Sequence, residues 1–149
     1  MTLVLLAEHD RAIRTHGQEA FPQECCGLLL GRPDGVGRTV VRLVAEENAR
    51  EPAQRHNRFS ISPEAYMRGD REARREGLDI VGFYHSHPGA PARPSAYDLD
   101  HAWPWYSYII VSIRDGRALE LTSWVLKDDR SRFEQQELRI VGAEDPPTT

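Results

Sequence analysis

The stretch that decides the architecture of this chain is Asp79-Ile80-Val81-Gly82-Phe83-Tyr84-His85-Ser86-His87-Pro88. Its first six residues are rich in β-branched and aromatic side chains, which favours a buried strand. Side chains two positions apart on a strand point to the same face, so His85 and His87 can both turn toward one ion. Pro88 lacks a backbone N–H and is expected to end the strand.

A polar pair follows this strand at helical spacing. A short loop rich in Gly and Pro leads into Ser95-Ala96-Tyr97-Asp98, which predicts the first turn of a helix. Positions i and i+3 of a helix share a face, so Ser95 and Asp98 can both face the histidines. Two neutral nitrogens and one carboxylate leave one position of a tetrahedral zinc ion open, as in catalytic sites. We therefore predict a zinc site formed by His85, His87 and Asp98.

Each part of this pattern also has a purely structural explanation. Ser-x-x-Asp at a helix start is a common N-cap with an acidic first turn. A single His-x-His is often a pair of packed or surface histidines. A strand that ends in His-x-His-Pro, a short loop and a Ser-x-x-Asp helix start have no packing reason to occur together, so the joint pattern favours the metal site.

The remaining segments predict a single α/β domain with a curved mixed β-sheet flanked by helices. Helices are expected where apolar residues recur at helical spacing, and strands where β-branched runs are bounded by turn residues. The domain is expected to cover residues 1–141, followed by a mobile tail over residues 142–149. The expected helices are 7–18, 63–76 and 95–102; the expected strands are 26–31, 38–44, 79–88, 106–113, 118–126 and a final edge strand at 133–141, with a surface loop at 48–57 and extended structure at 59–61.

Composition and charge limit the classes of function. The formal net charge of −4 gives no reason to expect nucleic acid as the main partner. No apolar run approaches the roughly 18 residues of a membrane span, and Leu3-Val4-Leu5-Leu6 is too short for a signal peptide. Cys25 and Cys26 are adjacent, which does not suit an unstrained disulfide, so we expect a reduced protein in the cytoplasm.

A zinc hydrolase also needs a group that takes a proton from the attacking water and passes it to the leaving amine. Glu24 is a candidate because it directly precedes the predicted strand 26–31. Spacing alone does not select it over Glu46, Glu47 or Glu51.

A family signature is present in three segments, Glu24-x-Cys26-Gly27-Leu28-Leu29-Leu30-Gly31, His85-Ser86-His87-Pro88 and Ser95-x-x-Asp98. Together they resemble the JAMM (MPN-plus) metallopeptidase family, and the resemblance extends from about Glu8 to Trp124. The gaps from His87 to the serine and to the aspartate match the family pattern. The resemblance implies the JAMM/MPN fold, with a cytidine-deaminase-like architecture.

The same resemblance implies a role for each residue of the signature. His85, His87 and Asp98 would bind zinc. Glu24 would act first as general base and then as general acid. Ser95 would help to hold the oxyanion, and we expect this use to compete with its use as a helix cap.

The resemblance also implies a substrate class. The chain is most similar to compact bacterial members, whose substrate is a small ubiquitin-like sulfur-carrier protein with a C-terminal Gly-Gly. Those enzymes release an amino acid such as cysteine, or a C-terminal extension, and the tail is expected to bind as an added strand beside a sheet edge. Members that cleave ubiquitin chains usually carry insertions near the metal loop, and Pro88–Ser95 leaves no room for one. A homodimer is left open.

Four alternatives stay open at this point. The chain could be a catalytically inactive MPN-type scaffold or a DNA-repair-associated JAMM relative, although the latter usually carries an additional helix-hairpin-helix region. A cytidine deaminase would need His-x-Glu and Cys-x-x-Cys, which are not found in this sequence. A cysteine hydrolase would use Cys25 or Cys26 with His85, although a buried cysteine is usually inert.

Some aromatic and polar residues after the predicted metal ligands have two interpretations. His101 either orients Asp98 from behind or faces solvent. Trp103, Trp105 and Tyr106 form an aromatic cluster that either belongs to the core, which we favour, or lines a substrate groove.

Overall fold

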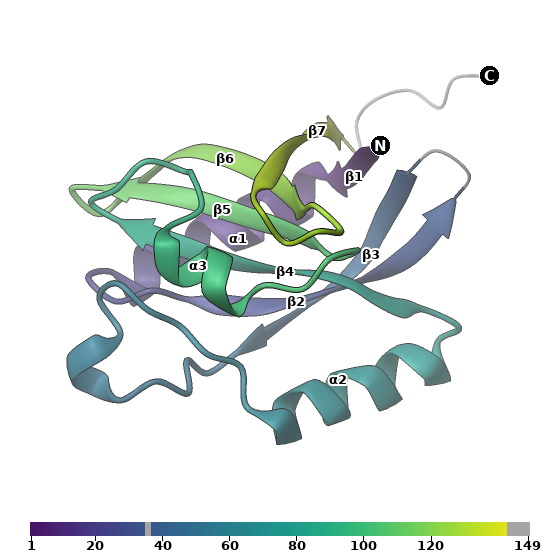
Figure 1. The fold of residues 1–149 in the computed structure, drawn as a ribbon, viewed down its shortest axis with the longest axis horizontal. Helices are drawn as coiled ribbons and strands as arrows, with labels where there is room; N and C mark the ends of the chain where they lie inside the picture. The colour runs from purple at the N-terminus through teal and green to yellow at the C-terminus, as the bar shows by residue number, and fades with distance from the viewer. Residues whose placement is uncertain (35–36, 143–149) are drawn as a thin grey trace.

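The computed structural model describes residues 1–34 and 37–142, and Figure 1 shows its fold. In this part of the chain, seven strands form a closed, barrel-like mixed sheet in the order β1-β3-β2-β4-β5-β6-β7. The strands are β1 (Thr2–Leu6), β2 (Cys26–Asp34), β3 (Gly37–Glu46), β4 (Asp79–Pro88), β5 (Ser107–Arg114), β6 (Arg117–Leu126) and β7 (Phe133–Val141); the helices are α1 (Ala7–Ala20), α2 (Pro63–Arg75), α3 (Ala96–His101) and a short 3₁₀ turn (Pro52–Gln54).

The sheet separates the apolar side chains into cores on its two faces. The main core lies on the face that α1 covers, and Figure 1 shows α1 behind the sheet with α3 in front. A second core lies between β2, β4 and α2 on the opposite face, and a third lies beside α3. The main core contains Leu3, Leu5, Ile13, Cys25, Leu29, Val40, Val81, Tyr84, Ile109, Val111 and Ile113.

β4 lies between β2, to which it is antiparallel, and β5, to which it is parallel. The β2–β4 register shifts between the pairs Leu29–Gly82 and Leu30–Ile80, so Val81 is an extra residue on β4. A bulge of this kind changes which residues share a face. Val81 and Tyr84 therefore both pack into the main core. Phe83, His85 and His87 face the opposite side of the sheet, where α2 and α3 lie.

The predicted fold class is confirmed, but several details differ. Thr2–Leu6 forms a strand that was not among the predicted ones, and its Leu3 and Leu5 are fully buried at 0% exposure. The predicted strand 133–141 is present as β7, but β7 pairs with both β6 and β1, so the prediction that it lies at an edge is wrong. Residues 59–61 lie outside any helix or strand, and the predicted tail, apart from residue 142, lies outside the described residues. Across residues 1–34 and 37–142, no helix is long and apolar enough to cross a membrane.

Gly82 lies where β4 and β5 approach closely. A Cβ at this position would lie 2.0 Å from the backbone oxygen of Ser107 on β5. A backbone atom of a paired strand cannot move aside, so we expect Gly82→Ala to lower the free energy of unfolding by about 2–3 kcal/mol. Urea unfolding followed by circular dichroism measures the change.

Gly69→Ala on α2 is the matched control for this substitution. Its Cβ would lie 2.2 Å from Cδ1 of the buried Leu28 side chain, whose end can shift where backbone cannot, and in ordinary contact with Ile80. Alanine also favours a helix over glycine by about 1 kcal/mol, so the loss is expected to be clearly smaller. Equal losses for the two variants would contradict the explanation from backbone contact.

Candidate metal centre

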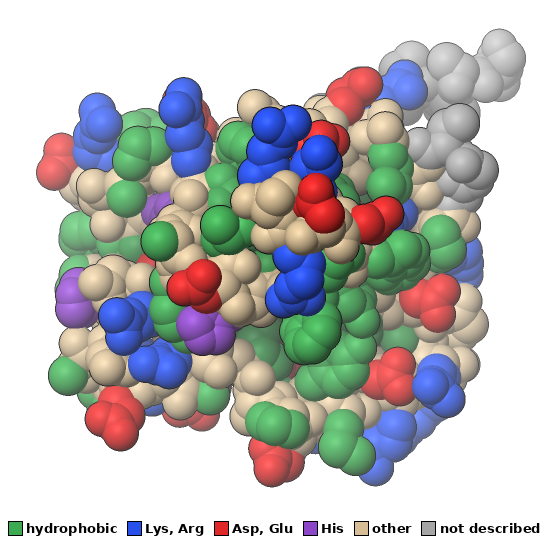
Figure 2. Space-filling view, viewed as in Figure 1, with side chains coloured by type: hydrophobic (Ala, Val, Ile, Leu, Met, Phe, Trp, Pro, Cys, Tyr) green, Lys and Arg blue, Asp and Glu red, His purple; other side chains and the backbone are tan. Residues whose placement is uncertain are grey.

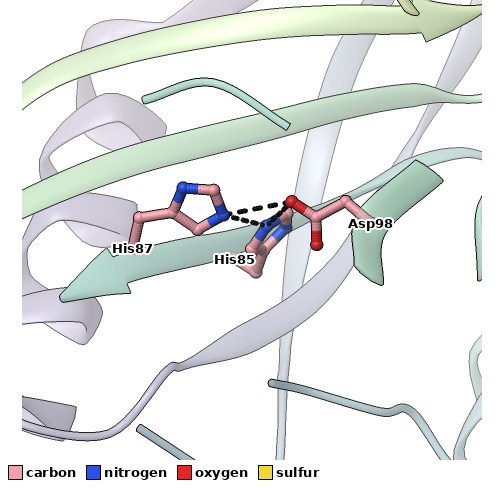
Figure 3. A group of neighbouring side chains, drawn as sticks. All are labelled: His85, His87 and Asp98. Atoms are coloured by element: carbon pink, nitrogen blue, oxygen red, sulfur yellow. Dashed lines mark hydrogen bonds and ion pairs between the residues drawn. The ribbon is translucent and has the colours of Figure 1, made fainter. Parts of the chain in front are cut away.

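The three predicted metal ligands converge in the structure. The Nε2 atoms of His85 and His87 on β4 lie 3.0 Å apart, and Oδ2 of Asp98 on α3 lies 3.2 Å from the first and 3.1 Å from the second. Figure 3 shows the two rings and the carboxylate pointing toward one another. All three side chains are buried. Within the described residues, they form a group whose ligand atoms can reach one metal ion.

The chemistry of these side chains fits a divalent ion. Zinc–nitrogen and zinc–oxygen distances of about 2.0–2.2 Å in a tetrahedral site place ligand atoms about 3.3–3.5 Å apart, close to the spacings seen here. Nδ1 of His87 lies 2.9 Å from the carbonyl oxygen of Pro91. The carbonyl can only accept, so Nδ1 carries a proton, and once a metal ion displaces the proton of Nε2, the lone pair of Nε2 faces the group. The site therefore presents donors that suit zinc.

The charges of Asp98 and His85 agree with this assignment. Burial disfavours the charged form of Asp98, but His85, hydrogen bonds from both histidines and the backbone N–H of Ser95 together hold its pKa well below the usual range. Burial lowers the pKa of His85. An ionised carboxylate and a neutral imidazole are the states that a metal ion requires. Burial acts to lower the pKa of His87, but its contacts with Asp98 and Pro91 outweigh burial and raise that pKa, so a metal ion binds this ring by displacing a proton.

A capping box fixes the position of Asp98. Ser95 is the N-cap of α3: its Oγ accepts a hydrogen bond from the backbone N–H of Asp98 at 3.0 Å, and its own N–H donates to Oδ2 of Asp98 at 2.9 Å. Accepting a hydrogen bond uses a lone pair and leaves the hydroxyl proton free to donate. The cap and an oxyanion contact are therefore compatible, which corrects the expectation that they compete.

The β2–β4 register brings Glu24 to the metal ligands. Cys26 on β2 pairs with His85, and Ser86 continues this register by donating its N–H to the carbonyl of Cys25 at 3.2 Å. The Ser86 hydroxyl also accepts from the N–H of Cys25 at 2.8 Å. Continuing the antiparallel register by one residue places Glu24 opposite His87.

Glu24 is a buried acid with one carboxylate oxygen that is unpaired among the described residues. It is 5% exposed, and among the described residues its Oε1 atom makes no hydrogen bond. Burial raises its pKa to about 8, an effect that His87 opposes and Asp98 reinforces. A cation held by the ligands would favour the charged form and lower this pKa. A buried acid with a free oxygen beside a metal site has the properties of a general base.

The metal centre lies between two hollows. His85 and Asp98 line the larger one, of about 690 Å³, whose other walls are mostly aromatic and apolar. His87, Glu24 and Ser95 line the smaller one, of about 190 Å³. Figure 2 shows hydrophobic side chains gathered between α2 and the segment that follows α3, where the larger hollow opens. The ligands thus form part of the wall of both.

Two residues of the site were missed at the sequence level. The ring of Phe59 stacks on His85, with centroids 4.3 Å apart. Asn48 lies in the predicted surface loop but is 7% exposed, and its amide donates to the carbonyls of Glu24 and Arg58. Single Phe and Asn residues in a polar segment carry no pattern that would have identified them.

The aromatic residues after α3 lie closer to the groove than expected. Trp103 and Trp105 are 62% and 46% exposed, so the preference for a core role was wrong for both. Trp103 and Tyr106 line the larger hollow, and Tyr106 also packs against the core. Nδ1 of His101 hydrogen-bonds to the carbonyl of Tyr97 at 2.8 Å rather than to Asp98, and His101 is exposed to solvent.

The structure argues against a cysteine nucleophile. Cys25 and Cys26 are free and buried. Burial raises the pKa of Cys25 to about 11 and that of Cys26 to about 12. Thiols with such pKa values stay protonated near neutral pH, and the thiolate is the reactive form.

Removal of the carboxylate ligand tests the metal centre. We expect Asp98→Ala to lose most of its bound zinc, because two histidines alone hold the ion much more weakly. Atomic absorption after dialysis measures the zinc content of the variant. Asp100→Ala, at an exposed position of the same helix, is the control and should keep its zinc. An unchanged zinc content in Asp98→Ala would mean that the ligand set is misassigned.

Solved structures resemble this fold. A protein from Desulfitobacterium hafniense matches with a TM-score of 0.82 and 32% identity, over 94% of this chain and 93% of that one. A structure described as a JAMM metalloprotease-like zinc site in the proteasome and signalosome matches with a TM-score of 0.57 and 19% identity, over 95% and 99% of the two chains. At that identity the second likeness concerns the fold alone.

Several sequence relatives are named as enzymes that cleave protein conjugates or peptides. A desampylase from Haloferax volcanii is 37% identical over 77% of this chain and 83% of its own length. A CysO-cysteine peptidase from Mycobacterium tuberculosis is 32% identical over 85% of this chain and 84% of its own. A probable TtuB-protein conjugate cleaving protease from Thermus thermophilus is 32% identical over 72% and 68%. Residues 6–127 match the Prok-JAB family model. The predicted JAMM resemblance and peptidase class are confirmed, and the chain belongs to the prokaryotic homologues of the JAB domain.

Proposed function

We propose that this protein is a zinc-dependent peptidase that hydrolyses the amide bond after the C-terminal Gly-Gly of a small ubiquitin-like carrier protein. The observation that carries the proposal is the convergence of Glu24, from before β2, on the three ligands from β4 and α3. An orphaned buried acid beside two histidines and a carboxylate is a complete set of groups for amide hydrolysis.

Each residue has a defined task in this reaction. Zinc, when bound, supplies Lewis acidity that polarises the scissile carbonyl and makes water acidic enough to lose a proton near neutral pH. Glu24 takes that proton at its free Oε1 and delivers it to the leaving nitrogen. The Ser95 hydroxyl, whose proton is not used by the cap, donates to the developing oxyanion.

The larger hollow suits the tail of a carrier protein. Its apolar, aromatic lining favours the side chains that precede the scissile bond. Two glycines at the end of the tail let its backbone pass beside the buried histidines without a clash. β4 is already paired on both sides, so the tail cannot add to the sheet at β4 itself. The names of the relatives, which refer to CysO and to TtuB conjugates, support this substrate class.

The substrate is identified by incubating the zinc-loaded protein with Gly-Gly-terminated carriers from the same genome, each carrying a C-terminal extension. Mass spectrometry should detect a cut directly after Gly-Gly. A wild-type protein that takes up no zinc on dialysis and cleaves none of these carriers would instead support a scaffold.

Glu24→Gln tests the proton-transfer role. The amide cannot accept or deliver the proton, so we expect zinc content and fold to be unchanged while kcat falls by about 10²–10⁴. Glu51→Gln, at an exposed position in the nearby loop, is the control and should keep full activity. Retained turnover in Glu24→Gln would remove Glu24 from this role.

Ser95→Gly separates the two uses of the serine. Glycine replaces an N-cap serine at a cost of only a few tenths of a kcal/mol, but it removes the hydroxyl donor. We expect kcat to fall by about 10²–10³ with little change in melting temperature or zinc content. Ser95→Thr keeps the hydroxyl and should retain most of the activity. A Ser95→Gly enzyme with wild-type kcat would leave the serine with the capping role alone.

A further inference from the structure

Glu24, which must protonate the leaving amine, lines the smaller hollow. In the proposed function, Glu24 passes a proton to the departing nitrogen, so the leaving group must lie beside Glu24. Glu24 lines the 190 Å³ hollow and is absent from the described lining of the 690 Å³ one. The carrier tail and the leaving group therefore occupy opposite sides of the metal ligands.

The volume of this hollow matches a small leaving group. At about 30 Å³ for each water molecule in the liquid, 190 Å³ corresponds to roughly six waters. One amino acid fits here, but the hollow opens to solvent, so its volume does not exclude a longer leaving group. Size alone does not decide what binds, because the chemistry of the lining residues must also fit.

A cation faces this hollow. Arg93 lines it and is exposed, and no carboxylate of the described residues lies within ion-pair distance of its guanidinium. Of the described lining residues, Glu24 is the acid, while His56 and Asn57 add two further groups that can donate hydrogen bonds. A guanidinium binds a carboxylate through two parallel hydrogen bonds. The lining therefore favours a leaving group with a free carboxylate.

The backbone that carries Arg93 is firmly anchored. The Ser112 hydroxyl of β5 donates to the carbonyl of Ala90 at 2.6 Å, and the Thr122 hydroxyl of β6 donates to the carbonyl of Ala92 at 2.7 Å. Ala92 is 0% exposed, so the loop is packed against the sheet immediately before the arginine. A fixed backbone limits the conformational entropy that the loop loses when a ligand binds to Arg93.

We infer that Arg93 binds the α-carboxylate of a single amino acid that leaves from the carrier, and so makes the enzyme selective for carriers extended by one residue. The inference rests on the proposed function. The α-carboxylate lies two bonds from the scissile nitrogen, within the same hollow. An isopeptide-linked lysine presents four methylene groups there instead, and a longer extension presents a neutral amide. Hydrolysis forms the C–O bond at the terminal glycine, breaks the C–N bond and releases the amino acid with the proton delivered by Glu24.

The test compares a charged and a neutral leaving group of equal shape. The probes are the Gly-Gly carriers of the same genome, extended by one alanine that ends in a carboxylate or in a carboxamide. Alanine is used because a cysteine thiol would itself bind zinc. We expect wild-type kcat/KM to be about tenfold higher for the carboxylate, mainly through KM.

Three variants assign this preference to Arg93. Arg93→Gln should reduce the ratio to about one, mainly by slowing cleavage of the carboxylate substrate, and Arg93→Lys should keep part of the preference. Arg11→Gln, on the exposed face of α1, is the charge-matched control and should keep the full ratio. Titration calorimetry in a Glu24→Gln background should show the same tenfold difference in Kd without turnover.

The outcomes separate this inference from the proposed function. A wild-type ratio near one, an unchanged ratio in Arg93→Gln, or faster cleavage of a lysine isopeptide than of the one-residue extension would each overturn the role of Arg93. Cleavage of the carriers in those cases would leave the proposed function standing. A wild-type enzyme that cleaves no carrier would overturn both.

Discussion

The antiparallel pairing of β2 with β4 is the constraint on which the site depends. Before the first residue of β2, the pairing is continued by two hydrogen bonds between Cys25 and Ser86, one of which uses the serine hydroxyl. Strand pairing fixes which residues lie opposite one another, and a slip by one residue would turn every side chain to the other face. The bulge at Val81 sets the phase of this pairing, so that both histidines leave the main core and face the groove.

Asp98 and His87 are held in place by hydrogen bonds to the backbone around them. Asp98 is tied to its own helix start by the capping box, and His87 is oriented by the carbonyl of Pro91. By contrast, Oε1 of Glu24 and Nδ1 of His85 have no partner among the described residues. Unpaired buried polar atoms are costly to a folded protein, and they are tolerated where a reaction needs them. These two atoms lie where the chemistry would take place, although unpaired buried atoms also occur on His9, Arg50 and Gln136.

The two hollows differ in size and in lining, so the site has two chemically different sides. One is large and mostly apolar, while the other is small and lined by Glu24, Arg93 and Ser95. A peptidase must hold two products of different character, and a wall formed by the metal ligands separates these environments. The loop between His87 and Ser95 contributes to the smaller side, so its short length and its anchoring shape that hollow directly.

The sequence by itself determined the local parts of this protein. His-x-His on a strand and Ser-x-x-Asp at a helix start are set by backbone periodicity, so the ligands, the cap and the α/β class could be read from neighbouring residues. Glu24 could be named only through family resemblance, because its approach to His87 depends on a pairing between segments about sixty residues apart. The closure of the sheet by β1 and β7, the stacking of Phe59 on His85 and the division into two hollows were decided by the tertiary structure alone. They arise from contacts between distant segments, which no local pattern of residues encodes.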